Sequence, residues 1–455
     1  MAVVLPPLGL ASIAAVLRKA GHEVRLLDAA REPLVPNDQW AKRIAACEPD
    51  LVGFGATTPS FHDAVDVCRR VKDLRPSART VFGGVHVSWA RARALRDCDA
   101  IDFAVAGEGE AAMVALARGD APQTVAGLVY RDGAVVKSAK AQEREDLCVM
   151  DELPFPAYDL LEGFPHRYRL PLFSYPRGPG AHVISSRGCV YQCSYCDRVV
   201  YGRTFRWNSP EYTFELVKHL RTDYGIRHVI FFDDLFTLNR ERVARLCDLL
   251  SGARLGVTFN CIVRIGHIDG ELIGMLKRAG CWMINVGIES GDQAILDANK
   301  DGVTLEGVRR DVDMLVAAGI HVKGLFMLAF PGETIESMRK TVDFACSLPL
   351  KDANVTTFTP YPGSPIAEGI EALGAFDNNW DKMDCEQVVF VPREIGSREA
   401  VEKAYGDFYS RFYSRPFARK IYRRMMIEAP GSYWRLLKGL PSYLGYVRRL
   451  RRSPT

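Results

Sequence analysis

Two series of short apolar runs alternate with helix-length segments along this chain, and that alternation limits the fold more than any other feature. Strands that alternate with amphipathic helical patterns are typical of β/α units, which assemble into parallel sheets. We therefore predict an α/β protein with a Rossmann-like domain over residues 1–140 and a partial (β/α)6 barrel over residues 181–375.

In the first series, the spacing of Leu10, Ile13, Ala14 and Leu17 predicts a helix over residues 10–20. The predicted strands cover residues 24–27, 51–55, 80–82 and 103–105. Ligands of such sheets bind beyond the carboxyl ends of the strands. The candidate binding residues in the loops that follow the strands are Thr57, Thr58, Ser60, Gly83, Gly84, His86, Gly107 and Glu108.

The second series begins after a proline-punctuated segment, residues 141–180, that we interpret as a linker. Its predicted strands cover residues 183–185, 228–232, 257–261, 283–287, 324–329 and 354–358. The active sites of β/α barrels lie at the carboxyl ends of the strands, so chemistry is expected there. Residues 376–455 form a predicted extension that is mostly helical and basic.

Composition agrees with a protein of several folded domains. A chain of 455 residues predicts two or three domains. Its hydrophobic fraction of 48% and charged fraction of 25% are those of globular proteins and exclude disordered and collagen-like classes. No apolar run approaches the ~20 residues of a spanning helix, and the first residues do not resemble a signal peptide. A cytoplasmic location is therefore expected.

Three of the 12 cysteines, Cys189, Cys193 and Cys196, form a C-x3-C-x2-C group directly after a predicted strand. A structural zinc site would need a fourth ligand, and no other Cys or His lies near this loop in the sequence. A distant fourth ligand, or three unrelated thiols, are the alternatives. A [4Fe–4S] cluster fits better, because three thiolates leave one iron open to another ligand.

The cysteine group resembles the loop of the radical S-adenosylmethionine (SAM) superfamily, C-x3-C-x-aromatic-C, with Tyr195 at the aromatic position. The resemblance implies that the open iron chelates SAM and that one electron cleaves it to methionine and a 5′-deoxyadenosyl radical. It also implies an external one-electron donor of the flavodoxin or ferredoxin type. The three cysteines are then both the metal ligands and the catalytic residues.

Later strand ends resemble the same superfamily and supply candidate SAM contacts. Asp233 and Asp234 match the second-strand segment, with helix capping as the alternative role. Arg264 matches the fourth strand, where it could hold a carboxylate, and a surface ion pair is its alternative. Glu289 and Ser290 match the fifth-strand motif.

The amino-terminal domain resembles the cobalamin-binding domain of one radical SAM class through the motifs P-P-L-G-L, F-G-G-V-H and G-E-G-E. The resemblance implies that the strand-end loops hold the corrin; ordinary turn glycines are the alternative. None of the nine His has Asp two residues before it, so a lower axial histidine is not expected. The chain begins close to the first motif, where relatives usually have a first strand and a longer loop, so a truncated start is an alternative that bears on the completeness of the corrin site.

These resemblances favour a cobalamin-dependent radical SAM C-methyltransferase. The deoxyadenosyl radical would abstract hydrogen from an unactivated carbon of a small-molecule or lipid substrate, and methylcobalamin would supply the methyl group. One alternative is an oxidative cyclase or rearrangement enzyme acting on a tetrapyrrole, natural product or lipid. Another is a non-catalytic corrin- or tetrapyrrole-binding protein.

The net charge of +4 conceals an uneven distribution. From residue 410 to the end there are 12 basic residues and one acidic residue, so this tail carries +11 and the remainder carries −7. Aromatic residues interleave with the basic ones. The interpretations are a helical cap with a solvated basic face, peripheral contact with an anionic inner membrane, and, least favoured, nucleic acid.

Overall fold

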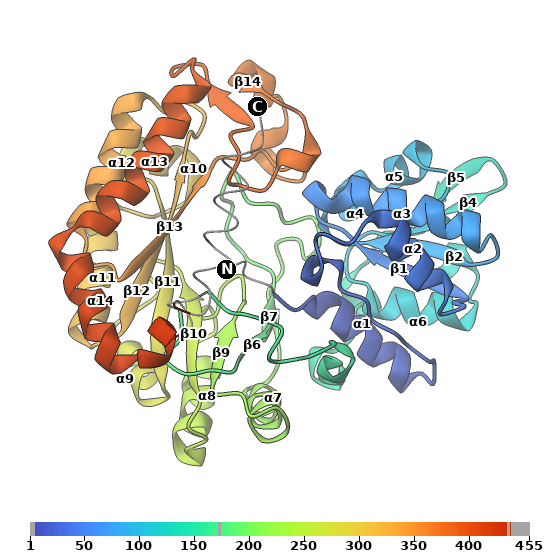
Figure 1. Cartoon of the computed structure of the whole chain (residues 1–455), viewed down its shortest axis with the longest axis horizontal. Helices are drawn as coiled ribbons and strands as arrows, with labels where there is room; N and C mark the ends of the chain where they lie inside the picture. Colours follow the sequence, from blue (N-terminus) through green and yellow to red (C-terminus); the bar gives the residue numbers. More distant parts are fainter. Residues whose placement is uncertain (1–4, 172–173, 435–436, 438–455) are drawn as a thin grey trace.

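The computed structural model describes residues 5–171, 174–434 and 437, and it contains two α/β domains side by side (Figure 1). The amino-terminal domain, in blue, lies beside a larger barrel whose colours run from green to orange. A linker without long helices or strands connects them. The predicted architecture of a Rossmann-like domain followed by a partial barrel is therefore confirmed.

The amino-terminal sheet has five strands in the order β1-β2-β3-β4-β5. The first three are parallel, and the last two form an antiparallel hairpin that the β/α pattern did not predict. The strands are β1 (Leu51–Gly55), β2 (Arg79–Gly83), β3 (Phe103–Val105), β4 (Leu128–Asp132) and β5 (Val135–Ser138). The carboxyl ends of β1, β2 and β3 therefore meet at one edge of the sheet, as predicted.

Helices cover this sheet because each buries one apolar side. They are α1 (Leu8–Lys19), α2 (Asn37–Ala45), α3 (Phe61–Leu74), α4 (Val85–Ala90), α5 (Ala92–Asp97) and α6 (Glu110–Arg118). In α1, Leu8, Ala11, Ala14 and Leu17 are buried. That 3.6-residue spacing is the one from which the helix was predicted.

The strand predicted at residues 24–27 is absent, and this prediction was wrong. Within the described ranges, no strand lies beside this segment to form a ladder. Val24 and Leu26 instead pack against the cluster of Ala14, Ala15 and Ala157. Its apolar residues are explained by packing on α1 and the linker and do not require a sheet.

The barrel sheet has six parallel strands in the order β13-β12-β11-β10-β9-β6. They are β6 (Gly180–Val183), β9 (His228–Phe231), β10 (Thr258–Val263), β11 (Cys281–Glu289), β12 (His321–Leu328) and β13 (Asp352–Thr357). All six predicted strands are present. The first begins earlier than predicted, at Gly180, which pairs with His228. It also ends earlier, because the Ser185 backbone N–H donates to the Asp233 carboxylate and not to the ladder.

Helices line the outer face of this sheet (Figure 1). They are α7 (Pro210–Asp223), α8 (Arg240–Ala253), α9 (Gly270–Arg278), α10 (Gln293–Asn299), α11 (Leu305–Ala317) and α12 (Ile335–Ser347). Side chains alternate along each strand: Val286 and Ile288 of β11 enter the core beneath the helices, and Asn285 and Glu289 face inward. The inner face of the sheet is thus available for polar contacts.

The carboxyl-terminal region is mostly helical, as predicted, with one small hairpin of β14 (Gly374–Phe376) and β15 (Phe390–Pro392). The helices α13 (Arg398–Ser414) and α14 (Pro416–Glu428) lie on the outside of the barrel near α11 and α12 (Figure 1). Buried Arg415 donates to the carbonyl oxygens of Ala345 and Leu348, which end α12. The described start of the basic tail is therefore a cap on the barrel.

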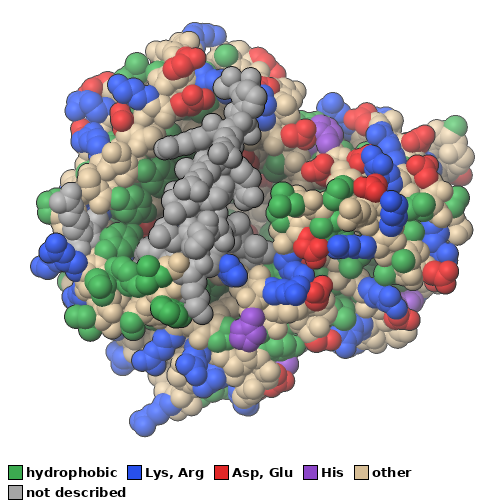
Figure 2. Space-filling view, in the orientation of Figure 1, with side chains coloured by type: hydrophobic (Ala, Val, Ile, Leu, Met, Phe, Trp, Pro, Cys, Tyr) green, Lys and Arg blue, Asp and Glu red, His purple; other side chains and the backbone are tan. Residues whose placement is uncertain are grey.

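The described helices include none long and apolar enough to cross a membrane. On the face shown in Figure 2, basic and acidic side chains alternate over the amino-terminal domain. Exposed helical pairs such as Lys42 with Asp38 account for part of this pattern. Residues 435–436 and 438–455 of the basic tail lie outside the described residues.

Candidate cofactor site between the two domains

The three cysteines lie in one loop that is closed at its base by a two-stranded ribbon, β7 (Ser186–Arg187) and β8 (Arg206–Trp207). Gly188 starts the loop with φ +88°, and a Cβ at this position would lie 2.0 Å from the Thr204 carbonyl oxygen. The Gly188 N–H donates to an Asp234 carboxylate oxygen at 3.0 Å. Only glycine fits at the entry of this loop.

The thiols of Cys189, Cys193 and Cys196 are all free and partly exposed. Burial, together with the neighbouring Cys193 and Cys189, raises the pKa of Cys196 to about 12. The three sulfurs therefore share one electrostatic environment. Metal binding would draw the protons off these thiols, because thiolates are the ligands of iron and zinc.

This donor set fits an iron–sulfur cluster with an open iron better than a closed zinc site. Three soft thiolates are suited to either metal, but a structural zinc site needs four ligands. In the part of the chain that the structure describes, no group of three or more His, Cys, Asp and Glu side chains is gathered as a metal centre. The loop thus holds three thiols and no preformed fourth ligand.

Arg264 lies beside the cysteine loop, and Tyr195 lies within it. The Arg264 guanidinium lies over the Tyr191 ring at 3.6 Å, and its Nη1 is 3.9 Å from the Cys193 sulfur. The Tyr195 ring packs edge-on against Phe330, and burial raises the pKa of its hydroxyl. A cation next to the thiols favours the negative charge that bound thiolates would carry.

The two predicted aspartates occupy different places. Asp233 is fully buried, and its two oxygens accept hydrogen bonds from the Ser185 N–H and Ser185 Oγ, both at 2.6 Å. Asp234 instead supports the cysteine loop through Gly188. The following helix α8 is capped by Asn239, so the alternative that either aspartate caps it was wrong.

Glu289 and Ser290 end strand β11. Glu289 has φ +68°, which is costly for a residue with a side chain and is typical of functional sites. Its carboxylate accepts from Lys300 Nζ at 2.8 Å, a partner that the sequence patterns did not reveal. The Ser290 hydroxyl is buried 3.2 Å from the Thr341 hydroxyl, and it also accepts from the Asp292 N–H. Ser290 therefore shapes the turn before α10.

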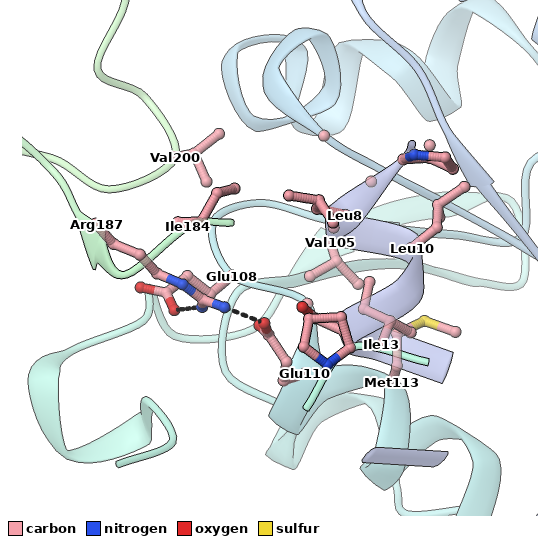
Figure 3. A pocket seen from close by; sticks show the side chains of 18 of the residues that line it. Leu8, Leu10, Ile13, Val105, Glu108, Glu110, Met113, Ile184, Arg187 and Val200 are labelled. Carbon is pink, nitrogen blue, oxygen red and sulfur yellow. Dashed lines mark hydrogen bonds and ion pairs between the residues drawn. The ribbon is translucent and has the colours of Figure 1, made fainter. Parts of the chain in front are cut away.

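A cavity of about 450 Å³ lies between the amino-terminal sheet and the barrel (Figure 3). Most of its lining is apolar, including Leu8, Leu10 and Ile13 from α1. The barrel side supplies residues 184, 187, 200, 201, 208, 212 and 216. Five predicted binding residues line it: Thr57, Gly83, Gly84, Gly107 and Glu108. The strand-end loops thus form one wall of an interdomain cavity.

Glycine is favoured at two positions of these loops, where φ is positive and a Cβ would lie close to neighbouring atoms. Gly84 has φ +102°, and a Cβ there would lie 2.8 Å from the Ala56 carbonyl oxygen. Gly107 has φ +100°, and a Cβ there would lie 2.3 Å from the Gln142 side chain. Glycine at these positions satisfies the positive φ, and it also lets a large flat ligand approach the backbone closely.

Thr58, Ser60 and His86 do not line this cavity. The His86 ring packs against Phe61 at 4.2 Å and Trp380 at 4.4 Å, and burial lowers its pKa to about 4. The Ser60 hydroxyl accepts from the Thr57 N–H, and Thr58 lies 3.3 Å from His86. These three residues support the loop and its contact with the carboxyl-terminal segment.

Four charged residues join the two domains at the edge of the cavity, and three of them, Glu108, Glu110 and Arg187, line it. Arg187 pairs with Glu108 and, at 2.6 Å, with Glu110, and Arg206 also pairs with Glu108 (Figure 3 shows the Arg187 pairs). Sequence patterns singled out only Glu108 from this group. The signal for Arg187 was its place two residues before Cys189, whereas nothing local pointed to Arg206.

Two family models match the chain: one described as "B12 binding domain" over residues 1–117, and one described as "Radical SAM superfamily" over residues 183–345. An uncharacterized methyltransferase of Pyrococcus horikoshii is 32% identical over 415 residues, which cover 89% of this chain and 88% of that protein. The anaerobic magnesium-protoporphyrin IX monomethyl ester cyclase of Rubrivivax gelatinosus is 26% identical, over 89% of this chain and 73% of that protein.

Two solved structures share the fold of both domains. OxsB, a cobalamin-dependent SAM radical enzyme solved with aqua-cobalamin and SAM, has a TM-score of 0.73 at 16% identity and covers 95% of this chain and 70% of its own. The methyltransferase TsrM from Kitasatospora setae, solved with cobalamin and a [4Fe–4S] cluster, has a TM-score of 0.68 at 19% identity over 88% and 82%. A B12-binding domain followed by a radical SAM domain confirms the resemblance inferred from the motifs. The chain belongs to the cobalamin-dependent radical SAM methyltransferase family, whose cofactors are a [4Fe–4S] cluster, SAM and cobalamin.

Proposed function

We propose that this enzyme methylates an unactivated carbon of a small organic or lipid substrate. The observation that carries the proposal is the cavity that runs from the glycine loops of the amino-terminal sheet to Arg187, beside the cysteine loop. When bound, the cofactors supply hydrogen abstraction by a radical and a methyl donor. The candidate sites of the cofactors adjoin one another, and this is required if hydrogen abstraction and methyl transfer act on the same carbon.

In this proposal, the residues of the chain hold, orient and shield the cofactors. Cys189, Cys193 and Cys196 would hold the cluster. Arg264 has the fork geometry to bind a carboxylate such as that of SAM, and Glu289 could accept hydrogen bonds from its amino or ribose groups. The apolar cavity wall would exclude water from the reacting groups.

The inner face of the barrel supports a substrate with a polar, uncharged group. Among the described residues, both ring nitrogens of His182, Oδ1 of Asn260 and Oδ1 of Asn285 are buried without a hydrogen-bond partner. These residues lie on β6, β10 and β11 and alternate with residues that enter the outer core. Buried polar atoms are rarely left unpaired, so a ligand that hydrogen-bonds to them is a reasonable occupant.

SAM cleavage by the anaerobically reconstituted protein tests this proposal. The wild-type protein with a reductant should convert SAM to 5′-deoxyadenosine and methionine, and Cys193→Ala should lose this activity together with its iron. Cys346→Ala, a partly buried cysteine away from the loop, is the matched control and should keep both. Cleavage that persists in Cys193→Ala would contradict the proposal.

The cyclase relative from Rubrivivax gelatinosus favours a second candidate, an oxidative cyclase, because it matches along 89% of this chain. The two reactions differ in the mass of the product. Methylation adds one carbon and two hydrogens, whereas oxidative ring closure removes hydrogen. Mass spectrometry of the product of a candidate substrate separates them.

We also propose that the exposed side of the cysteine loop receives the external electron donor. Val190 in the loop and Trp207 at its base are 43% and 42% exposed, and exposed apolar side chains are frequent in docking sites. Substituting both with Ser should slow reduction by flavodoxin at least several-fold while leaving reduction by dithionite unchanged. An equal loss with both reductants would contradict this assignment.

For the basic tail we propose peripheral contact with an anionic membrane. On α14, Met426 and Ile427 are 58% and 85% exposed and lie next to Arg423 and Arg424. Apolar and basic side chains together are typical of helices at membrane surfaces. Ile427→Ser combined with removal of residues 432–455 should abolish co-sedimentation with phosphatidylserine vesicles and preserve SAM cleavage. Unchanged sedimentation would contradict the proposal.

A further inference from the structure

The base of the cysteine loop contains two arginines that face each other. In the ribbon of β7 and β8, Arg187 is the direct cross-strand partner of Arg206. Like charges at directly opposed positions destabilise an antiparallel pair. A ribbon with two residues in each strand is also too short to be stable without outside support. Something other than the ribbon itself must therefore hold the base of the loop together.

That support comes from the other domain. Glu108 accepts hydrogen bonds from both Arg187 and Arg206, and Glu110 accepts from Arg187 at 2.6 Å. All four side chains are about nine-tenths buried, with exposures between 7% and 12%. Burial opposes the charge on Arg187, but the carboxylates of Glu110 and Glu108 outweigh it and raise the pKa of the guanidinium. The two positive charges are balanced by two negative ones.

The Glu108 loop is itself fixed within the amino-terminal domain. The Gln142 side chain accepts from the Glu108 N–H at 2.9 Å and donates to the Glu108 carbonyl oxygen at 2.6 Å. Ser88 Oγ accepts from the Gly107 N–H at 3.0 Å. The backbone of Glu108 is therefore held by its own domain, and its carboxylate fixes the position of the ribbon relative to that domain.

The same side chains are walls of the interdomain cavity. Glu108, Glu110 and Arg187 all line it (Figure 3). A ligand that fills the cavity would displace water from one side of this ion cluster. Because ion pairs strengthen as the surroundings become less polar, filling the cavity should tighten the pairs that close the loop.

We propose that Glu108 is a positioning residue that couples the interdomain cavity to the cysteine loop, so that a ligand in the cavity and a cluster on the loop each favour binding of the other. The inference rests on the proposed placement of the corrin in this cavity. Coupling of this kind is reciprocal and is commonly at least about fivefold in affinity.

The test is the dissociation constant of aquacobalamin, measured by absorbance titration in two states of the full-length protein, with the cluster reconstituted and with the iron chelated. The wild-type protein should bind at least about fivefold more tightly in the reconstituted state. Glu108→Gln keeps the shape of the side chain but removes the charge shared by the two arginines. Its ratio of dissociation constants should fall toward one.

Two further variants test whether the change in the ratio comes from the charge of Glu108. Glu336→Gln removes an exposed glutamate that pairs with Arg339 at 2.6 Å, and it should keep the wild-type ratio. Glu108→Gln combined with Arg206→Gln restores charge balance at the ribbon, and it should regain part of the ratio even if the single variant folds poorly. A merely structural role would not predict that recovery.

Three results would overturn the inference. A wild-type ratio of one, with aquacobalamin bound in both states, would remove the coupling and leave the corrin site standing. A Glu108→Gln ratio equal to that of the wild type would assign any coupling to other residues. Failure of the wild-type protein to bind aquacobalamin in either state would overturn both this inference and the proposed corrin site.

Discussion

The two candidate cofactor regions are built in different ways. In the amino-terminal domain, the cavity wall is mainly backbone and apolar side chains, held in place by glycines at the ends of parallel strands. In the barrel, the candidate site is a loop with three thiols, closed at its base by a short ribbon. Among the described residues, no metal centre is preformed. The first region recognises shape, whereas the second depends on reactive side chains and on support from its neighbour.

This difference predicts which substitutions will affect which cofactor. Backbone changes in the glycine loops should act mainly on corrin binding. Changes at the entry of the cysteine loop should act mainly on the cluster. Each change should reach the other cofactor only through the coupling at Glu108, which is about fivefold. The predictions that follow test this separation, beginning with the largest expected effect.

Gly188→Ala should abolish cluster assembly. The new Cβ would lie 2.0 Å from the Thr204 carbonyl oxygen, and φ +88° is strained for alanine by about 1–3 kcal/mol before the clash is counted. Iron content after reconstitution should fall at least about tenfold, while aquacobalamin still binds. Gly202→Ala, also at positive φ but with open space around its Cβ, is the matched control. Normal iron content in Gly188→Ala would contradict the account.

Gly84→Ala should weaken corrin binding and leave the cluster intact. Its Cβ would lie 2.8 Å from the Ala56 carbonyl oxygen, so the loop must shift or strain at φ +102°. We expect a loss in aquacobalamin affinity of about tenfold, equivalent to ~1.4 kcal/mol. Gly252→Ala, with nothing near its Cβ, should behave as wild type. An equal fall in iron content would show that the two regions are not separable.

Acid should destabilise the amino-terminal domain through His86. Burial, together with His62 and Arg93, lowers the pKa of His86 to about 4 from an ordinary value of 6.5. The unfolded chain therefore binds the proton first, and stability is lost as pH falls from about 6.5 toward 4. Between pH 7 and 5 this linkage removes about 2 kcal/mol. In His86→Phe, the free energy of unfolding measured with urea should lack this pH-dependent contribution. A pH dependence equal to that of the wild type would contradict the prediction.

Lys42→Gln should have the smallest effect. Lys42 pairs with Asp38 one helical turn earlier, at 2.9 Å, and both side chains are exposed. Pairs of this kind contribute about 0.3–0.5 kcal/mol, and salt screens them. The midpoint of urea unfolding should change little, and neither cofactor should be affected. A change in cobalamin or iron content would mean that surface charges matter beyond the cavity.

Sequence periodicity predicted the parallel strands well because each one is a short run that is buried on at least one face and separated from the next by a helix-length segment. It failed where another contact explained the same apolar residues. Val24 and Leu26 looked like a strand, but they pack on α1 and the linker. The hairpin of β4 and β5 was missed, although Asp132 at the end of β4 and Gly133 directly after it form a strong turn signal.

The candidate site was only partly predictable. The cysteines and the glycine loops are local motifs, and the structure brings them to the places expected from strand ends. The pairing of Glu108 with Arg187 and Arg206 joins residues 79 and 98 positions apart. Asp233 and Asp234 look equivalent in the sequence, yet burial and the Ser185 contacts separate their roles. Such contacts depend on how the domains pack, which no local pattern encodes.

The most direct test of the central claim, that one chain carries both cofactors in separate adjoining sites, is the ultraviolet-visible spectrum and iron content of the anaerobically reconstituted protein. The account predicts one cobalamin and about four iron atoms per chain. It also predicts that a variant with alanine at all three of Cys189, Cys193 and Cys196 keeps the corrin bands and loses the iron. A wild-type spectrum without corrin bands, or iron retained by the triple variant, would contradict it.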